Sequence, residues 1–409
     1  MASQQKPVLI AGGGIASLLL AQSLYRNKIP FQLFERDASP VFRGQGYRLR
    51  LSAEGLDAIE GALGPEKWKV FWDTCGKTAG SGFQALDAFT GKQIDWSDNA
   101  EKPKEVTPPK PGSIKPEALT SRDGKIVGIS RGDMRKIFLS DCEPFIKWSH
   151  QVTGYESTAD GVRVIFADGS KSDEGSLLVG GEGIYSKVAK QLSQGKIKIF
   201  DTGARGIHGQ APTTAFKGLG EGVWRMSDRS REDGNVFVIT NVRSGDMDDP
   251  NVIFGWTMGA QPGIIEPPGG DYALIGAPAA DIAKSITANW HESIRPLFEQ
   301  MIDQDAAFWK ITCSSPSGVP EWPNDPRVTV IGDSVHGMTP AGGNGANTAV
   351  RDSALLGRLI AEAGGYQPGL TEEYEKKMRV YASEMVKGSY EIAITQFGVQ
   401  IDEATSKTI

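Results

Sequence analysis

Apolar residues near the start of the chain form two kinds of pattern. Val8 to Ala11 is a continuous apolar run of strand length, and three glycines follow it. Ile15 to Arg26 then carries apolar residues at helical spacing, and Phe31 to Phe34 is a second strand-like run that ends at Glu35. A strand, a tight turn, a helix and a second strand in this order predict a βαβ unit with parallel strands.

The last third of the chain repeats this arrangement. Arg327 to Ile331 is a β-branched run, and a Gly-rich loop extends from Gly332 to Asn347. Apolar residues at helical spacing from Thr348 to Ala361 predict a helix after the loop, and a closing helix is predicted from Thr371 to about Ile394. Between the two ends, Leu177 to Val179 predicts a further buried strand that leads into another glycine-rich turn.

The middle of the chain shows the alternation that half-buried strands require. Gln151 to Phe166 predicts a hairpin, and several strand-like runs within residues 200–320, notably Val236 to Val242 and Val252 to Met258, predict a mostly antiparallel sheet. Residues 99–124 hold five prolines among polar residues. That composition predicts an irregular surface segment, with a lid over a pocket as the alternative.

Composition narrows the classes of function. The 409 residues suffice for one large α/β unit and a second sheet, and the net charge of −6 argues against nucleic acid as a partner. The three cysteines are widely spaced and form no CxxC pair, so we expect neither a disulfide framework nor a metal site, and a reducing, cytoplasmic compartment. Glycines and polar residues interrupt the apolar stretch 8–25, so we expect no membrane span.

The first glycine turn has the spacing of a dinucleotide site. Gly12 allows the tight turn, Gly14 lets the backbone approach a pyrophosphate, and Glu35, 23 residues beyond Gly12, is positioned to bind ribose hydroxyls. The third position of this fingerprint is Ser17 instead of glycine, which adds a side chain between helix and strand. We expect the packing to adjust around Ser17 without loss of the site.

The second glycine loop is the most specific feature of the sequence. Its amides and the following helix N-terminus favour an anionic group, and Asp333 lies at the end of the preceding strand. This stretch resembles the GD motif of the group A FAD-dependent aromatic hydroxylases, the para-hydroxybenzoate hydroxylase-like flavoprotein monooxygenases. The matching positions are Gly332, Asp333, His336, Pro340, Gly343, Gly345, Asn347, Ala349 and Asp352.

Two further segments match the same family in the expected order. Gly180 to Gly183 resembles the family's Gly-Ala-Asp-Gly turn, with Glu182 at the aspartate position, and a strand-loop-helix junction without ligand contact is the alternative. Arg131 stands where relatives have an arginine that contacts FAD. The alternative is that Arg131 simply begins a helix with Ser130 as the N-cap. Arg48 and Arg50 share one face of a predicted strand and could meet FAD phosphates, NAD(P)H, an anionic substrate or solvent.

The resemblance implies an α/β fold with a Rossmann-like FAD-binding domain of the glutathione reductase type. Residues 1–65, 125–195 and 325–409 would form that domain, and residues 66–124 and 196–324 an interleaved substrate-binding region on a mostly antiparallel sheet. The residues expected to contact FAD are Gly12, Gly14, Glu35, Arg36, Arg48, Arg131, Glu182, Asp333, Pro340, Gly343, Gly345, Ala346 and Asn347.

The same resemblance implies a secondary-metabolism monooxygenase that hydroxylates or epoxidises a small aromatic or polycyclic compound through a flavin C4a-hydroperoxide. No second strand-GxGxxG-helix unit is present, so NADPH or NADH is expected to bind transiently as the reductant, with O₂ as the other co-substrate. The pocket candidates in the substrate region are His208, Trp224, Arg225, Trp256 and Met258, while His336 is expected to be structural. A flavin oxidase, dehydrogenase or halogenase, or a binding protein without flavin, remain as alternatives; the tryptophan spacing disfavours the halogenase.

Overall fold

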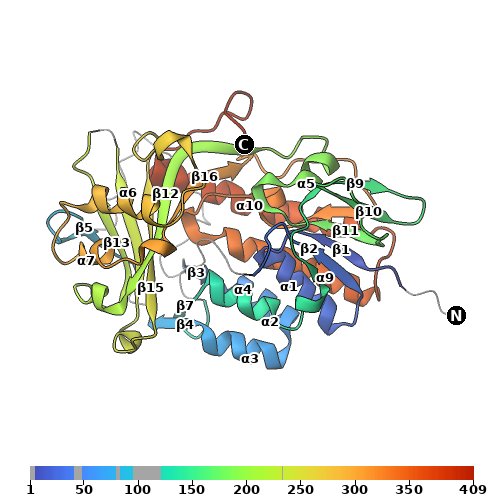
Figure 1. The fold of residues 1–409 in the computed structure, drawn as a ribbon, viewed down its shortest axis with the longest axis horizontal. Helices are drawn as coiled ribbons and strands as arrows, with labels where there is room; N and C mark the ends of the chain where they lie inside the picture. The colour runs from blue at the N-terminus through green and yellow to red at the C-terminus, as the bar shows by residue number, and fades with distance from the viewer. Residues whose placement is uncertain (1–4, 41–47, 80–82, 95–120, 233) are drawn as a thin grey trace.

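The computed structural model describes residues 5–40, 48–79, 83–94, 121–232 and 234–409. Most of the proline-rich segment 99–124, and with it the proposed lid, lies outside these residues. Figure 1 shows two halves side by side. We call them the parallel-sheet half, which contains the N-terminal end of the described chain, and the seven-stranded half, built mainly from residues 83–94 and 199–314.

The predicted βαβ unit forms the centre of the parallel-sheet half. Strand β1 (Val8–Ala11), helix α1 (Ile15–Arg26) and strand β2 (Phe31–Phe34) follow one another as the pattern predicts. The sheet order is β17-β11-β1-β2-β8, and all neighbouring strands are parallel. The other strands are β8 (Ile146–Lys147), β11 (Leu177–Gly180) and β17 (Val328–Val330). Because helices cover such a sheet, its strands are apolar runs and not alternating ones.

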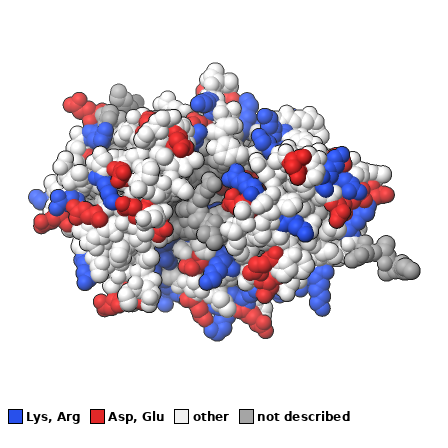
Figure 2. Space-filling view, viewed as in Figure 1, with Lys and Arg blue, Asp and Glu red and all other residues white. Residues whose placement is uncertain are grey.

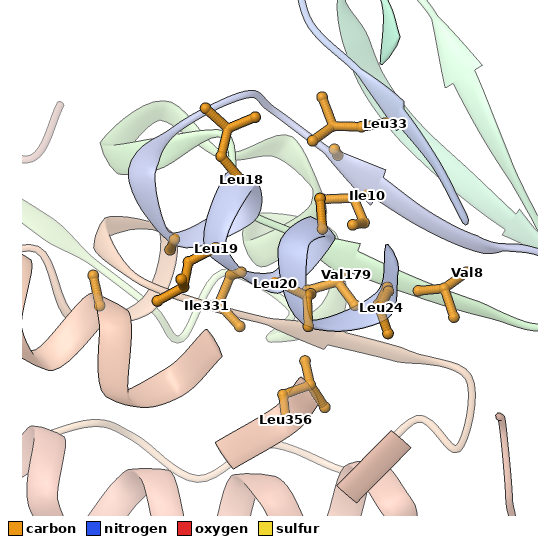
Figure 3. Close-up of a cluster of buried hydrophobic side chains, with 14 of the residues drawn as sticks. Val8, Ile10, Leu18, Leu19, Leu20, Leu24, Leu33, Val179, Ile331 and Leu356 are labelled. Carbon is orange, nitrogen blue, oxygen red and sulfur yellow. The ribbon is translucent and has the colours of Figure 1, made fainter. Parts of the chain in front are cut away.

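Figure 3 shows why these strands and helices hold together. Leucines on successive turns of α1 pack against β1, β2 and β11 on the sheet and against helix α9 (Gly345–Glu362). These side chains are nearly or completely inaccessible to solvent. The labelled members are Val8, Ile10, Leu18, Leu19, Leu20, Leu24, Leu33, Val179, Ile331 and Leu356. This core fixes the turn after β1 and the loop after β17 at the same edge of the sheet.

The remaining elements of the parallel-sheet half surround this core. A three-stranded antiparallel sheet of order β3-β7-β4 lies on the side of the seven-stranded half, and β9 and β10 form the predicted hairpin. The strands are β3 (Arg48–Leu51), β4 (Gly76–Ala79), β7 (Lys125–Ser130), β9 (Val152–Ser157) and β10 (Val162–Phe166). The helices are α2 (Ala53–Leu63), α3 (Pro65–Thr74), α4 (Arg131–Leu139), α5 (Lys187–Leu192), α8 (Asp333–His336) and α10 (Leu370–Phe397).

The seven-stranded half is the predicted, mostly antiparallel sheet. Its order is β16-β12-β15-β14-β13-β5-β6, and among these pairs β13 and β5 are parallel. The strands are β5 (Phe83–Asp87), β6 (Gln93–Ile94), β12 (Ile199–Pro212), β13 (Gly222–Asp228), β14 (Val236–Val242), β15 (Ile253–Ala260) and β16 (Ala307–Ser314). Helices α6 (Ala277–Thr287) and α7 (Pro296–Glu299) cover one face, and that face forms a second core.

Short 3-10 helices complete the described chain. They are Glu143–Phe145, Gly183–Tyr185, Thr213–Phe216, Ser244–Asp246, Pro268–Gly270, Asp303–Asp305 and Ala341–Gly343. On the face shown in Figure 2, basic and acidic side chains are interspersed over both halves. In the part of the chain that the structure describes, no helix combines the length and the apolar character needed to cross a bilayer.

The structure moves one predicted boundary. The sequence placed the start of the substrate region at residue 66, but Phe71 and Cys75 are buried in the core of the parallel-sheet half. Strand β4 also pairs with β7 in that half. The chain therefore enters the seven-stranded half at β5, because the apolar face of α3 finds its partners in α2 and α4.

Candidate functional site

The first glycine turn has room for backbone only. Gly12 has a φ of 86°, and a Cβ atom there would lie 2.6 Å from the carbonyl oxygen of Gly181. Gly14 is the N-cap of α1 and provides no side-chain cap, and a Cβ on it would have no protein atom closer than 3.7 Å. The N-terminus of a twelve-residue helix therefore ends in uncapped amides beside open space, the arrangement that binds a pyrophosphate.

Glu35 is positioned at this turn as the sequence predicts. Its buried carboxylate accepts hydrogen bonds from the amide of Gly13 at 2.5 Å and from the amide of Asp37 at 2.9 Å. A carboxylate has about four acceptor positions, so capacity remains for the hydroxyls of a ribose. Arg36 follows on the exposed side of the chain.

The packing does adjust around Ser17. Its side chain is fully buried against Gly181, and a Cβ on Gly181 would lie only 2.2 Å from the Ser17 hydroxyl oxygen. Family members have alanine at the position of Gly181 and glycine at the position of Ser17. In this chain the larger residue, Ser17, faces the smaller residue, Gly181, so the two departures from the motifs compensate each other.

Glu182 lies in the expected turn, but its carboxylate is directed to helix α5. It accepts hydrogen bonds from the Ser186 hydroxyl at 2.7 Å and from the Val188 amide at 3.2 Å, and burial raises its pKa. The backbone of this turn lies against Gly12. The expected cofactor contact of the Glu182 side chain is therefore corrected to a capping role, and the turn contributes to the site through its backbone.

The GD segment supplies a second open helix start. Gly332 has a φ of 62°, and Asp333 begins α8 directly after it. Asp333 is accessible to solvent, and desolvation by the surrounding protein raises its pKa. Beyond Pro340, the loop contains Gly343 and leads to Gly345 and Ala346 at the start of α9, whose N-cap, Asn344, makes no side-chain capping bond.

A buried network holds this segment from below. The Nε2 atom of His336 lies 2.6 Å from Oδ2 of Asp352, and the same oxygen accepts from the Gly332 amide at 2.7 Å. The other carboxylate oxygen of Asp352 accepts from the Tyr381 hydroxyl at 2.6 Å. Burial alone would lower the pKa of His336, but the Asp352 carboxylate raises it. All of these groups lie beneath the loop, so the geometry gives His336 a structural position.

Asn347 connects this loop to β3. Its amide oxygen accepts from the Ser52 backbone at 2.8 Å, and its amide nitrogen donates to the carbonyls of Arg50 and Gly343. Arg50 donates to the carbonyl of Gly342 at 3.2 Å. Of the two arginines on β3, Arg50 therefore contacts the glycine loop, whereas Arg48 was named among the expected FAD contacts.

Arg131 begins helix α4. It is the first residue of α4 after the Ser130 N-cap, which accepts from the Asp133 amide. Burial raises the pKa of Asp333, and the charges of His336 and Arg131 oppose that rise. Burial also lowers the pKa of His208, and the positive charge of Arg131 lowers it further.

The two faces of the seven-stranded sheet have different partners. We call the face that carries Phe237 the inner face, because its ring packs against Phe397 of α10 at 5.1 Å between centroids. A row across this face runs from His208 through Thr257 and Ile239 to Arg225. The outer face packs under α6 and α7.

This geometry separates the pocket candidates. Trp224 and Trp256 lie in the outer core, where their indole nitrogens donate to the carbonyls of Gly220 and Leu297. Met258 is also part of that core. The expectation that these three residues line a pocket is corrected, because alternate residues of a strand point to opposite faces. His208 and Arg225 remain on the inner face.

His208 is held in a defined environment. Its Nδ1 atom lies 3.0 Å from the Thr257 hydroxyl, and its ring stacks on Trp309 with 4.8 Å between centroids and 5° between planes. Burial lowers the pKa of His208 to about 3. Sequence reasoning missed Thr257 and Trp309, although the alternation within β15 and β16 could have assigned both to the face of His208 once one face was known.

These features fit FAD. A Cβ atom is excluded at Gly12, the first turns of α1 and α9 have uncapped N-termini, and an acceptor for ribose hydroxyls lies at the end of β2. The inner face of the sheet, which carries His208, shares an apolar cluster with Ala341 of the glycine loop.

Comparison with known proteins agrees with this geometry. A family model described as an FAD binding domain matches residues 282–389. The dual O-methyltransferase/FAD-dependent monooxygenase elcB of Phaeosphaeria nodorum is 31% identical over 398 residues, which cover 87% of this chain and 40% of that protein. The aurachin C monooxygenase/isomerase of Stigmatella aurantiaca is 25% identical, over 94% of this chain and 88% of that protein.

A solved structure shows the same fold. Klebsiella pneumoniae HpxO, in complex with FAD and uric acid, superposes with a TM-score of 0.70 at 18% identity over 95% of this chain and 88% of that chain. The chain is similar to FAD-dependent monooxygenases along most of its length, and its cofactor is FAD. It spans less than half the length of the dual-function relatives that it matches.

Proposed function

We propose that this chain is a monooxygenase that uses NADPH or NADH and O₂ to hydroxylate or epoxidise a small aromatic or polycyclic metabolite. The observation that carries this proposal is that the two glycine turns, after β1 and after β17, lie at one edge of the parallel sheet and lead into helices without side-chain caps. The inner face of the seven-stranded sheet shares a buried apolar cluster with Ala341 of the glycine loop and with α10. A substrate on that face would lie next to the cofactor loop.

The proposed cofactor contacts divide the FAD molecule between the two glycine segments. Gly12, Gly14 and the N-terminus of α1 would hold the pyrophosphate, and Glu35 the adenosine ribose. Asp333 would accept from the ribityl hydroxyls, and the first turn of α9 would face the flavin ring. When bound and reduced, FAD supplies the electrons that activate O₂. The domain that we propose to bind it comprises the described residues before 80 together with 125–195 and 325–409.

The chain's own residues would position the substrate and exclude water. With a pKa of about 3, His208 is neutral at physiological pH, so it can donate or accept a hydrogen bond but is a weak base. Its stacking on Trp309 and its contact with Thr257 fix the ring. We therefore propose that His208 orients a hydroxyl or carbonyl oxygen of the substrate and does not remove its proton.

The nature of the inner face supports an aromatic substrate. Trp309 and Ile239 are partly exposed and provide apolar surface beside His208 and Thr257. Relatives named for monooxygenation of aurachin C, and for combined O-methylation and monooxygenation, are consistent with such compounds. The three cysteines are buried and free, which fits a reducing compartment, and we propose a cytoplasmic location.

The reaction can be tested in one cuvette. The purified protein should show the visible bands of oxidised flavin, which NADPH or NADH should bleach without oxygen and air should restore. Candidate aromatic compounds should accelerate NAD(P)H consumption and acquire one oxygen atom from ¹⁸O₂. A flavin that reacts with a substrate without NAD(P)H would favour an oxidase or dehydrogenase. A protein that remains colourless after reconstitution with FAD would contradict the proposal.

A further inference from the structure

Thr257 lies directly beside His208 on the inner face. The two residues are partners in the antiparallel ladder between β12 and β15, so their side chains project from the same face of the sheet. The Thr257 hydroxyl oxygen lies 3.0 Å from Nδ1 of His208, the distance of a direct hydrogen bond. Thr257 thus engages the ring nitrogen nearer to the backbone, and Nε2 is at the outer end of the ring.

This hydrogen bond decides which nitrogen of His208 carries the proton. Burial lowers the pKa of His208 to about 3, so the ring is neutral at physiological pH. A neutral imidazole has one N–H group that donates and one bare nitrogen that accepts. The partner of one nitrogen therefore determines whether the other nitrogen donates or accepts.

The surroundings of Thr257 favour its hydroxyl as the donor. Among the described residues, the His208 ring is the one hydrogen-bond partner of this hydroxyl. A hydroxyl that donates to a bare Nδ1 satisfies both groups with a single hydrogen bond. If Nδ1 carried the proton, the hydroxyl hydrogen would need a further acceptor, and a substrate that excludes water would leave that hydrogen unsatisfied.

The same hydrogen bond distinguishes the two ways in which the ring can face. His208 stacks on Trp309 with 4.8 Å between centroids and 5° between planes. A half-turn of the imidazole about its Cβ–Cγ bond would leave that stack intact but would replace Nδ1 by a carbon atom. Thr257, whose backbone is held between β12 and β14, makes this half-turn unfavourable because the hydrogen bond would be lost.

We propose that Thr257 is a positioning residue that donates to Nδ1 of His208 and so keeps the proton of His208 on Nε2. His208 then donates a hydrogen bond to the substrate, and the substrate oxygen that it meets is an acceptor. A carbonyl oxygen fits this position, because it accepts and has no hydrogen of its own to place. The substrate class is therefore an aromatic ketone or a related conjugated carbonyl compound. This inference rests on the proposed function, because it concerns the substrate of that site.

Nitrogen NMR of the histidine rings tests the proton position directly. In FAD-loaded protein labelled with ¹⁵N-histidine, protonated and bare ring nitrogens resonate far apart, and the His208 signals are those that disappear in His208→Phe. We expect wild-type His208 to carry its proton on Nε2. In Thr257→Val the ratio of Nε2 to Nδ1 protonation should fall roughly tenfold or more, because Nδ1 loses its donor. Thr257→Ser keeps a hydroxyl and should restore the wild-type signals.

Thr153→Val is the matched control, since it makes the same chemical change elsewhere. Thr153 is an exposed residue of hairpin strand β9, and its hydroxyl donates to the Ile165 carbonyl at 3.2 Å. This variant should leave the His208 signals unchanged. Thermal unfolding shows whether each variant is folded. If Thr257→Val does not fold, the spectra of the wild type and Thr257→Ser still decide the proton position.

A pair of neutral ligands tests the consequence for binding. 1-Tetralone carries a carbonyl oxygen that tetralin lacks, and the binding of each to the FAD-loaded protein is followed by the change in the flavin spectrum. The ratio of the two Kd values should favour the ketone roughly fivefold more in the wild type than in Thr257→Val. Thr257→Ser and Thr153→Val should keep the wild-type ratio.

The contrary outcomes are distinct. A wild-type ring that is protonated on Nδ1, or on both nitrogens at pH 7, overturns the proposal, as does a proton position that Thr257→Val does not change. Equal ratios in the wild type and Thr257→Val, or a protein that binds neither ligand, overturn the substrate class. Because the ring spectra need neither substrate nor turnover, Nε2 protonation in a protein that transfers no oxygen refutes only the proposed reaction. An active oxygenase with the proton on Nδ1 refutes only this inference.

Discussion

Gly12 and Gly332 shape the candidate site in the parallel-sheet half through their backbone conformation, whereas His208 in the seven-stranded half would act through its side chain. Both glycines have positive φ values, which only glycine adopts readily, so their positions are visible in the sequence. A side chain on a strand is functional or structural according to the face on which it lies, and the residue type alone does not give the face. Backbone sites are therefore easier to predict than side-chain sites.

The largest effect should come from adding one methyl group to the first turn. Gly12→Ala places a Cβ 2.6 Å from a carbonyl oxygen and imposes a positive φ on alanine, which together cost on the order of 4 kcal/mol. We expect little folded, flavin-bound protein. The expressed variant can be compared with the wild type by thermal unfolding and by the flavin content after purification.

Gly14→Ala is the matched control for Gly12→Ala. Its φ is −72°, and its Cβ would meet no protein atom closer than 3.7 Å. We expect the apoprotein to unfold near the wild-type temperature but to bind FAD at least tenfold more weakly, because the added methyl group would occupy space needed by the pyrophosphate. Wild-type FAD affinity in Gly14→Ala would place the pyrophosphate elsewhere.

The two faces of the seven-stranded sheet can be separated by a pair of substitutions. Trp256→Ala removes a large side chain from the outer core, where it packs at 4.9 Å from Phe298, and should cost about 3–5 kcal/mol of unfolding free energy. His208→Phe keeps a ring on Trp309 and should cost less than about 1.5 kcal/mol. The second variant should instead raise the KM for substrate at least tenfold, because the hydrogen bond to the substrate is lost.

Denaturant unfolding and steady-state kinetics of both variants check this difference. Trp256→Ala should keep the wild-type KM at temperatures where it is folded. A variant at Trp256 with altered KM and normal stability would return this residue to the pocket and contradict our assignment of the faces.

The contact between Ser17 and Gly181 should show measurable compensation. Gly181→Ala introduces a methyl group 2.2 Å from the Ser17 hydroxyl oxygen and should destabilise the protein by about 1–3 kcal/mol. Adding Ser17→Gly should restore most of that loss. A double-mutant cycle on unfolding free energies gives the coupling, and additive effects of the two substitutions would show that the contact does not explain both motif departures.

The sequence predicted the parts of the fold that depend on local pattern. Strand Val236–Val242 has the predicted bounds, and the βαβ unit follows the predicted order. The assignment of Trp256 failed because the alternation of β15 does not tell which of its faces is the core. Phe254, Trp256 and Met258 lie on the outer face, and Gly255, Thr257 and Gly259 lie on the inner face.

Contacts between distant segments could not be predicted from a single sequence. Ser17 and Gly181 each departed from a motif, but only the fold brings them together. Arg243 follows the end of a strand and carried no signal until the structure placed it beside Arg48. The predicted start of the substrate region, residue 66, was too early for the same reason. Helix α3 packs against α2, which precedes it in the sequence, and against α4, which follows it.

The smallest predicted effect is a pH dependence that differs between His208 and His336. The folded-state pKa of His208 is about 3, below its usual value of about 6.5, so the unfolded chain binds more protons between these values. The contribution of His208 to stability is therefore full above pH 6.5 and falls as the pH decreases towards 3. His336 has a raised pKa, so its contribution is present below pH 6.5 and is lost as the pH rises through the folded-state value.

Urea unfolding of wild type and His208→Gln at pH 5, 6, 7 and 8 checks the sign. Between pH 5 and pH 7, the unfolding free energy of the wild-type protein should rise by about 1 kcal/mol relative to that of the variant. This rise is smaller than the limit of about 1.4 kcal/mol per pH unit because His208 is partly accessible to solvent. The chain has four histidines, so their ring signals can be assigned by substitution. A His208 signal that titrates between pH 6 and 8 would show that this ring is not the neutral hydrogen-bonding group that the proposed mechanism requires.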